Sequence, residues 1–292
     1  MQNFFDILEQ EKGLSAEEVQ RRLDQFALIL RSIPATMKYH YHSPELEAFY
    51  RESGLKDCDA FHRLAVLQLM ESFRTEQLPV KVPESIGAFY VHEFDRLRTN
   101  VADADYVFGW ENDLFAKDIG IVSGRLIPAG PGLLEISGVP RSLLFKKGIS
   151  QFFRLAIMML FGLKGRGPLL TIHIHLANLE QFNPAGWEKS YRLIGEILEL
   201  NTHLKGLMRH AWFFDPAVAK ISPKLAYLRE IPEQYGAGIF YHSDEDADSG
   251  ALTRSGTRRN LFEKGDYTPR VYYLLWPRRQ LINYSRTLGR SF

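Results

Sequence analysis

The sequence predicts an α/β protein in which a mixed sheet is flanked by helices and preceded by a helical N-terminal subdomain. In the first eighty residues apolar side chains recur at helical spacing, and from Val80 the pattern changes to short apolar runs divided by Gly and Pro. After residue 133 strand-like and helix-like segments alternate, which indicates helices packed on a mixed sheet. We therefore expect a helical subdomain or lid over residues 1–80 and an α/β domain over 81–292, with no low-complexity linker between them.

Three helices are expected in the N-terminal part. Ser15 and Glu18 have the spacing of a capping box, and the apolar residues that follow recur at helical intervals: Val19, Leu23, Phe26, Ala27 and Leu30. Ser43 and Pro44 open a second helix, which continues to about residue 53. Asp59 can cap a third helix over residues 60–73, which has a wide apolar face.

The remaining chain is divided into candidate strands and helices. Strands are expected at 86–91, 106–110, 119–127, 133–139, 169–177, 204–214, 238–242 and 271–276. Helices are expected at about 147–163 and at 184–200, where Asn183 is a good cap and Pro184 suits the first helical position. Residues 216–229 are helical or irregular, and the polar segment 243–267 is expected to be a mobile surface loop.

Composition excludes several classes of protein. The chain has 36 basic and 35 acidic residues, so no overall charge favours general binding of nucleic acid. The single cysteine, Cys58, excludes an intramolecular disulfide and suits a reducing compartment. The first residues lack the basic and apolar regions of a signal peptide, so cytoplasm is the expected location.

The most apolar segment is Ile149–Leu163, which is interrupted by Arg154. At about fifteen residues it is shorter than the roughly twenty that a membrane span requires. We expect a core helix with Phe152, Phe153, Ile157, Leu160 and Phe161 turned inward. The alternative is an interfacial helix for peripheral membrane contact, because Lys146, Lys147, Arg154, Lys164 and Arg166 flank and interrupt the run.

The candidate site is centred on His173 and His175 in the segment LLTIHIHLA. Residues i and i+2 of a strand point to one face, and α/β folds place their chemistry at the carboxyl ends of strands. The two imidazoles could bind a divalent metal, with His210, Asp215 or His242 completing the ligand set. One histidine bonded in the core with its neighbour exposed is the structural alternative.

Metal-free acid–base catalysis is the second interpretation of the same residues. A histidine titrates near neutrality, and Glu188 or Asp215 could orient it. Tyr191 follows Glu188 by three positions, so both would share a helical face. Alternatively, Glu188 is a solvated residue of the first helical turn and Tyr191 packs at the rim.

Two further groups could bind substrate. Arg209 and Trp212 belong to the run RHAWFFDP, which combines charge with aromatic surface. The structural alternative is that Asp215 and Pro216 cap the helix that follows. Arg254 and Arg258 are four apart and could clamp a phosphate from one helix, unless the neighbouring acidic run neutralises them.

No phosphate-binding, nucleophile-elbow or zinc-protease motif is present. We expect an enzyme that acts on a small molecule by metal-assisted hydrolysis or group transfer. The order of elements from 133 to 276 is also compatible with an acyltransferase that uses a coenzyme A or carrier-bound acyl donor. The third expectation is a non-catalytic protein that docks a partner or a membrane through residues 149–163.

Overall fold

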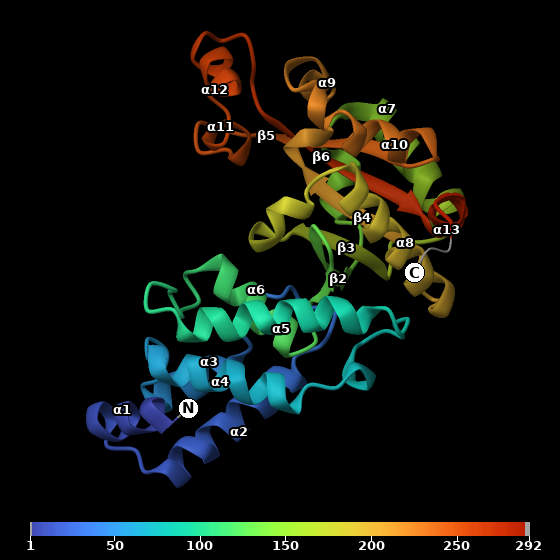
Figure 1. Ribbon diagram of the computed structural model, residues 1–292. Helices are drawn as coiled ribbons and strands as arrows, with labels where there is room; N and C mark the ends of the chain where they lie inside the picture. The colour runs from blue at the N-terminus through green and yellow to red at the C-terminus, as the bar shows by residue number, and fades with distance from the viewer. Residues whose placement is uncertain (1, 290–292) are drawn as a thin grey trace. The chain divides into compact units, whose positions relative to one another are not determined.

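The computed structural model describes residues 2–289 and has the mixed α/β architecture expected from the sequence (Figure 1). Its contacts divide the chain into two compact units. The first unit extends to residue 129 and includes residues 133–135 and 175–177. The second unit contains residues 130–132, 136–174 and the chain from Asn178 onward.

The first unit is built from the helices α1 (Gln2–Lys12), α2 (Ala16–Ser32), α3 (Pro44–Ser53), α4 (Asp59–Ser72), α5 (Ile86–Ala102) and α6 (Asp113–Val122). The capping box that starts α2 is confirmed, and its five predicted apolar residues are all buried. Ser43 caps α3 as expected. The third helix begins at Asp59 instead of being capped by it, and Cys58 precedes it without a side-chain cap. Phe26, Phe49 and Phe61 pack together in the core of this unit.

The strands expected at 86–91, 106–110 and 119–127 are wrong. Residues 86–91 begin α5, residues 106–110 form no strand, and residues 119–122 end α6. Periodicity cannot distinguish a short apolar run from a segment of buried helix. The longer pattern is helical, since α5 buries Ile86, Tyr90, Glu93, Leu97 and Val101 at intervals of three or four residues.

The sheet has six strands in the order β1-β2-β3-β4-β6-β5. These strands are β1 (Ile127–Ala129), β2 (Gly132–Ser137), β3 (Leu169–Ile174), β4 (Gly206–Ala211), β5 (Gly238–Asp244) and β6 (Arg270–Pro277). β3 and β4 are parallel, and β6 runs antiparallel to both β4 and β5. The carboxyl ends of β3, β4 and β5 therefore lie at the same edge of the sheet.

Helices cover both faces of the sheet in the second unit (Figure 1). On one face, α7 (Gly148–Ile157) and its π-helical extension (Met158–Gly162) contribute Leu155 and Leu163 to a cluster with Met208, Tyr273 and Leu275. On the other face, α8 (Pro184–Leu200) packs beside α13 (Arg278–Thr287), a helix that the sequence did not predict. There the rings of Tyr191 and Tyr284 contact Trp276.

The remaining helices of the second unit are short. They include the 3-10 helices η2 (Arg141–Phe145), η4 (Leu176–Gln181), η5 (Trp212–Phe214) and η6 (Pro223–Leu225), and the α-helices α9 (Pro216–Ile221), α10 (Tyr227–Gln234), α11 (Gly250–Thr253) and α12 (Gly256–Glu263). The polar segment expected to be a mobile loop thus contains two helices. Arg258 ties them together by donating to the carbonyl oxygen of Ala251 at 2.6 Å and to Ser222 Oγ at 2.8 Å.

Candidate functional site

His173 is the second-last residue of β3, whereas His175 follows the last residue of that strand. The strand ends at Ile174, so the alternation that would give the two imidazoles one face does not extend to His175. His173 is a partly buried residue of the second unit. His175 belongs to the first unit and has no solvent exposure.

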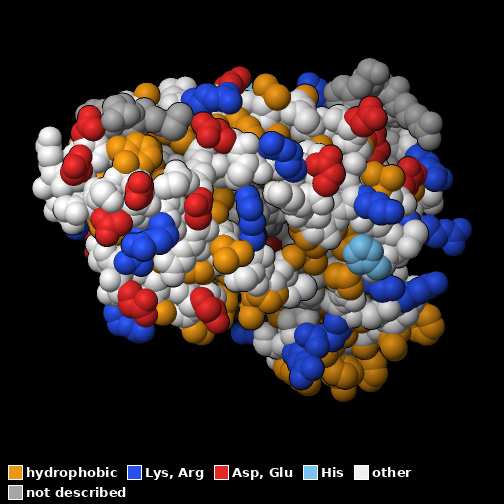
Figure 2. Space-filling model, turned by 90° about the horizontal axis from the view of Figure 1, so that it is seen from below, with side chains coloured by type: hydrophobic (Ala, Val, Ile, Leu, Met, Phe, Trp, Pro, Cys, Tyr) orange, Lys and Arg blue, Asp and Glu red, His pale blue; other side chains and the backbone are white. Residues whose placement is uncertain are grey.

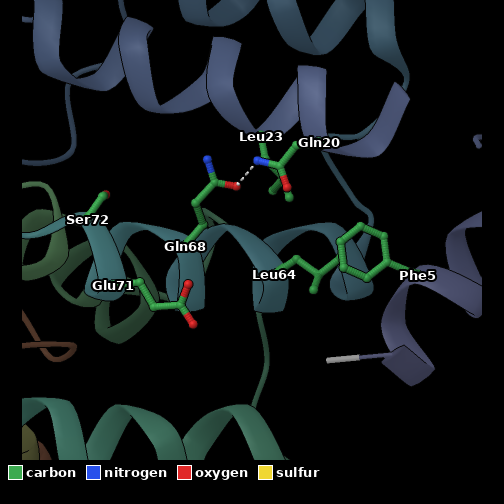
Figure 3. Close-up of a pocket in the computed structure, with 7 residues that line it drawn as sticks. All are labelled: Phe5, Gln20, Leu23, Leu64, Gln68, Glu71 and Ser72. Carbon is green, nitrogen blue, oxygen red and sulfur yellow. Dashed lines mark hydrogen bonds between the residues drawn. The ribbon is translucent and has the colours of Figure 1, made fainter. Parts of the chain in front are cut away.

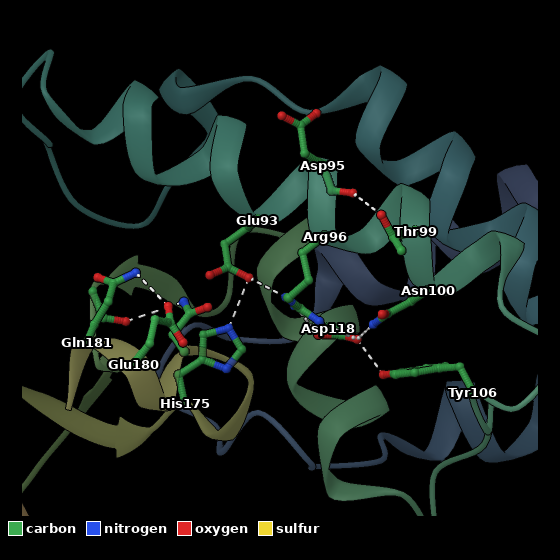
Figure 4. Close-up of polar contacts among 12 residues, drawn as sticks. Glu93, Asp95, Arg96, Thr99, Asn100, Tyr106, Asp118, His175, Glu180 and Gln181 are labelled. Atoms are coloured by element: carbon green, nitrogen blue, oxygen red, sulfur yellow. Dashed lines mark hydrogen bonds and ion pairs between the residues drawn. The ribbon is translucent and has the colours of Figure 1, made fainter.

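His175 is part of a buried polar network in the first unit (Figure 4). Its Nε2 lies 2.9 Å from Glu93 Oε2, which also accepts from Arg96 Nε at 2.9 Å. Its Nδ1 has no hydrogen-bond partner among the described residues. A fully enclosed imidazole that is hydrogen-bonded to a carboxylate corresponds to the structural alternative considered from the sequence.

Arg96 links this carboxylate to a second one. Its Nη2 lies 2.5 Å from Asp118 Oδ1, and Tyr106 also donates to Asp118 (Figure 4). Burial alone would lower the pKa of Arg96, but the carboxylates of Asp118 and Glu93 outweigh it and raise that pKa. The network thus joins α5 to α6 through one guanidinium that is shared by two buried carboxylates.

Another histidine is the strand neighbour of His173 in the second unit. Ile172 pairs with Arg209 in the parallel ladder, so His173 and His210 are the next residues of two adjacent strands and point to one face. The ring of His210 stacks on Tyr273 at 5.3 Å, and the ring of His242 approaches Tyr273 at 5.2 Å. Burial and then the charge of Lys146 lower the pKa of His242.

The carboxyl edge of β3, β4 and β5 therefore carries a row of three histidines and one tyrosine. This is the edge at which the sequence places the site. Within residues 2–289, however, no group of three His, Cys, Asp or Glu side chains is arranged to hold a metal ion. The metal site stays a prediction.

Arg209 is almost fully buried against aromatic rings on the opposite face of β4. Its guanidinium carbon lies 3.8 Å from the ring centroid of Trp187 and 4.5 Å from that of Phe213. No carboxylate pairs with it in the described chain. Burial lowers the pKa of Arg209 to about 10, and the nearby hydroxyls of Tyr191 and Tyr227 partly offset this effect. Arg209 and Tyr191 are therefore neighbours, but they form a packed core in place of an open substrate site.

The other predicted site residues serve local structure or lie apart. Asp215 caps α9 by accepting from the backbone N–H of Ala217 at 3.0 Å, and burial raises the pKa of its carboxyl group. Glu188 is a partly buried residue of α8. Trp212 packs its ring under the guanidinium of Arg258 at 4.3 Å.

The expected phosphate clamp of Arg254 and Arg258 is not formed from one helix. Arg254 is the exposed C-cap residue of α11, whereas Arg258 lies in α12 beyond a new cap at Ser255. Because the helix is interrupted between them, the four-residue spacing does not align the two side chains. Arg258 is also buried and already bonded to Ala251 and Ser222.

The apolar helix is not the core helix expected from its composition. Only Gln151 and Leu155 of α7 are fully buried, and Phe152 is partly buried. Six large apolar side chains are exposed by the following fractions: Phe145 77%, Ile149 74%, Phe153 57%, Ile157 57%, Leu160 67% and Phe161 76%. We call these six residues the apolar face. Leu155 packs against the sheet, and the apolar side chains on the other side of the helix stay exposed.

Basic side chains accompany the apolar face. Between Glu135 and Glu180 the sequence contains no acidic residue but has six basic ones: Arg141, Lys146, Lys147, Arg154, Lys164 and Arg166. Figure 2 shows hydrophobic side chains gathered at its lower right, with Lys and Arg side chains beside them. Among the described residues no helix is long and apolar enough to cross a membrane.

A pocket of about 280 Å³ adjoins α7 in the second unit. Its walls are formed by Lys147, Ser150, Gln151 and Arg154 of α7, by Pro216 and Arg229, and by Ile239, Tyr241 and Tyr272 of the sheet. We call it the α7 pocket. The Lys147 ammonium lies 4.6 Å from the ring centroid of Tyr241, and Arg154 donates to the carbonyl oxygen of Ile239 at 3.3 Å.

The first unit has a pocket of about 330 Å³ between α1, α2 and α4 (Figure 3). Its apolar walls are Phe5, Leu23 and Leu64, and the amides of Gln20 and Gln68 meet at 3.1 Å within it. Glu71 is the one ionisable side chain that lines it. No histidine, lysine or cysteine lines this pocket beside Glu71 and Ser72, so we place no catalytic site there.

The apolar face and the α7 pocket therefore lie on the same helix, and the sequence analysis predicted only some of their residues as functional. Phe145, Arg229, Tyr241 and Tyr272 were not predicted as functional. The 44-residue stretch without acidic residues is the signal that could have found the surface. Comparison with known proteins identifies no family: no family model matches the chain, and no curated protein or solved structure does.

Proposed function

We propose that the protein binds the surface of anionic membranes through α7 and its π-helical extension. The observation that supports this proposal is the apolar face, whose six large side chains are each more than half exposed within a stretch that has six basic and no acidic residues. Contiguous exposed apolar side chains of this kind are typical of surfaces that bind a partner or a membrane.

The length and sidedness of the segment favour a helix that lies in the membrane interface. The fifteen residues of α7 and its extension span roughly 22 Å at 1.5 Å per residue, too short to cross a bilayer whose apolar core is about 30 Å thick. One side of the helix is fixed to the sheet by Leu155, so its opposite side is free to enter the headgroup layer.

The charge around the helix favours an anionic surface over a protein partner. Each Lys or Arg close to an anionic leaflet contributes about 1 kcal/mol, and no acidic residue of the segment opposes this attraction. Burial of each large apolar side chain contributes roughly 1.5–3 kcal/mol to the free energy of binding, before the entropy that the side chain loses is subtracted. We expect the apolar and basic contributions to act together, so binding weakens as salt screens the charges.

Sedimentation with vesicles tests the proposal. The protein should pellet with vesicles that contain phosphatidylserine, pellet less with neutral phosphatidylcholine vesicles, and be partly released by high salt. Ile157→Asp should remove binding to both kinds of vesicle. Leu28→Asp is the matched control, because Leu28 is 70% exposed on α2 and lies outside the acid-free stretch.

Two results would contradict membrane binding. One is a protein that stays in the supernatant with every vesicle. The other is a concentration-dependent dimer that Ile157→Asp dissociates while vesicles have no effect, which would identify a second copy of the chain as the occupant of the apolar face.

A small-molecule enzyme is the second candidate, favoured by the row of His173, His210, Tyr273 and His242 at the carboxyl edge of the sheet. Elemental analysis of untagged protein tests for a divalent metal, and stabilisation by coenzyme A thioesters tests for acyl transfer. Stoichiometric metal that His173→Ala and His210→Ala remove would support metal-assisted hydrolysis or transfer. A flat response to both assays would count against this candidate.

A further inference from the structure

We infer that the α7 pocket binds the phosphate monoester headgroup of an anionic phospholipid. The inference rests on the proposed membrane binding for the source of the phosphate. At about 280 Å³ the pocket lies just below the range of roughly 300–1,000 Å³ that small-molecule sites occupy, so a headgroup suits it better than a nucleotide.

Two cations that line the pocket form no salt bridge within residues 2–289. Lys147 makes a cation–π contact with Tyr241, and Arg154 makes one with Phe240 and a hydrogen bond to a backbone carbonyl. Neither contact neutralises charge. Arg154 can offer two parallel N–H groups to phosphate oxygens, and Lys147 adds a point charge.

Two acidic groups near the pocket are paired with other cations. Glu233 accepts from Arg229 at 2.7 and 3.0 Å, and Asp244 pairs with Arg270 at 3.3 Å. Asp215 is buried and caps α9, and the charges of Arg270, Arg229 and Lys147 act on its carboxylate. An incoming anion would therefore meet Arg154, which forms no salt bridge among the described residues, with Lys147 beside it in the lining.

Neutral groups of the pocket suit a phosphate as well. Ser150 lines the pocket from within the first turn of α7, and no side chain caps the start of this helix. The N–H groups of the first helical turn can therefore bind an anion, and the helix dipole favours negative charge there. Tyr241 and Tyr272 supply walls on which a glycerol or sugar moiety can pack.

The pocket and the apolar face occupy neighbouring sides of one helix. Residues 147, 150, 151 and 154 recur at helical spacing toward the pocket, and residues 149, 153, 157 and 160 recur on the exposed side. A lipid whose headgroup enters the pocket can therefore leave its acyl chains with the apolar face in the same leaflet.

The test compares two vesicles of equal surface charge, one containing phosphatidic acid and one phosphatidylserine, with soluble glycerol 3-phosphate as a third ligand. Wild-type protein should prefer phosphatidic acid about tenfold, as expected for one lost charge-assisted interaction, and glycerol 3-phosphate should raise its melting temperature. Arg154→Gln should remove both the preference and the thermal shift. Arg141→Gln removes an exposed basic charge outside the pocket, so it should weaken binding to both vesicles equally.

Failure of the pocket and failure of membrane binding give different results. Equal binding to the two vesicles with no thermal shift would overturn the pocket inference and leave membrane binding intact. A thermal shift from glycerol 3-phosphate without binding to any vesicle would show that the pocket binds a free phosphate monoester and would overturn the inference that the phosphate belongs to a lipid. Ile157→Asp separates the two surfaces, because it should abolish vesicle binding and keep the thermal shift.

Discussion

The side-chain amide of Gln151 hydrogen-bonds to both backbone polar groups of Tyr241. Its Nε2 donates to the carbonyl oxygen of Tyr241 at 2.8 Å, and its Oε1 accepts from the N–H of Tyr241 at 2.8 Å. β5 is an edge strand of the sheet, so these backbone groups have no neighbouring strand to satisfy them. The amide takes the place of that strand, and it fixes which side of α7 faces the sheet.

Replacing Gln151 should therefore destabilise the second unit. Gln151→Leu leaves a backbone N–H and a carbonyl of a strand edge unsatisfied, which costs about 1–3 kcal/mol. Urea unfolding measures the loss. Gln20→Leu is the control, because Gln20 makes its bonds at an exposed position, and it should change the free energy of unfolding by less than about 0.5 kcal/mol. Equal effects of the two changes would argue against the Gln151 contact.

Leu155 and Ile157 lie two residues apart on α7 and should respond oppositely to truncation. Leu155 is fully buried beside Met208 and Leu275, so Leu155→Ala should cost about 2–5 kcal/mol. Ile157 is 57% exposed, so Ile157→Ala should cost less than about 1 kcal/mol. Urea unfolding of both variants distinguishes the exposed helix from a core helix. A large loss of unfolding free energy from Ile157→Ala would support the buried core helix that the composition predicts.

The sequence predicts elements best where caps and periodicity agree. The helix after Asn183 and Pro184 spans the predicted residues, and the strands around residues 133, 170, 207, 240 and 273 are present. The predictions fail where a short run contains no cap, as at the start of α5. There the helix has no side-chain cap, and its pattern becomes visible only over seventeen residues.

The candidate site was less predictable because it depends on tertiary pairing. Sequence spacing brings His173 and His175 together, but strand register makes His210 the neighbour of His173. The apolar composition of α7 predicted a buried helix. Which of its side chains are exposed depends on how much of the helix surface the sheet covers, and this is set by the tertiary fold. The acid-free stretch around α7 is a property of the sequence alone, and it marks the surface that the structure leaves open.

Arg209 should be replaceable by a residue of similar shape without charge. Its guanidinium is buried among Trp187, Phe213 and Phe214 and has no acidic partner in the described chain. Arg209→Met keeps most of the packing and removes a buried charge, so stability should stay within about 1 kcal/mol of wild type or increase. Arg209→Ala leaves a cavity and should cost about 2–4 kcal/mol. Thermal unfolding of the two variants measures these changes in stability. A loss from Arg209→Met as large as that from Arg209→Ala would show that the charge of the guanidinium contributes to stability.

His62 is held neutral in the core of the first unit. Trp110 Nε1 donates to the hydroxyl of Tyr50 at 2.6 Å, that hydroxyl lies 3.1 Å from His62 Nε2, and His62 Nδ1 lies 3.2 Å from the carbonyl oxygen of Phe108. A carbonyl can only accept, so the proton is on Nδ1 and Nε2 accepts from Tyr50. A second proton would break this chain, and burial lowers the pKa of His62 from 6.5 to about 4.

Stability should consequently fall on acidification. Because the folded-state pKa of His62 lies below its unfolded value, the unfolded chain takes up the proton first, and stability is lost progressively from about pH 6.5 down to about pH 4. The difference of about 2.5 pKa units corresponds to roughly 3 kcal/mol. His62→Gln preserves a donor and an acceptor but cannot titrate, so its unfolding free energy measured in urea should decline less than that of wild type across this range. His203→Gln, at an exposed position, should follow the wild-type curve. Parallel curves for wild type and His62→Gln would show that protonation of His62 does not couple to unfolding.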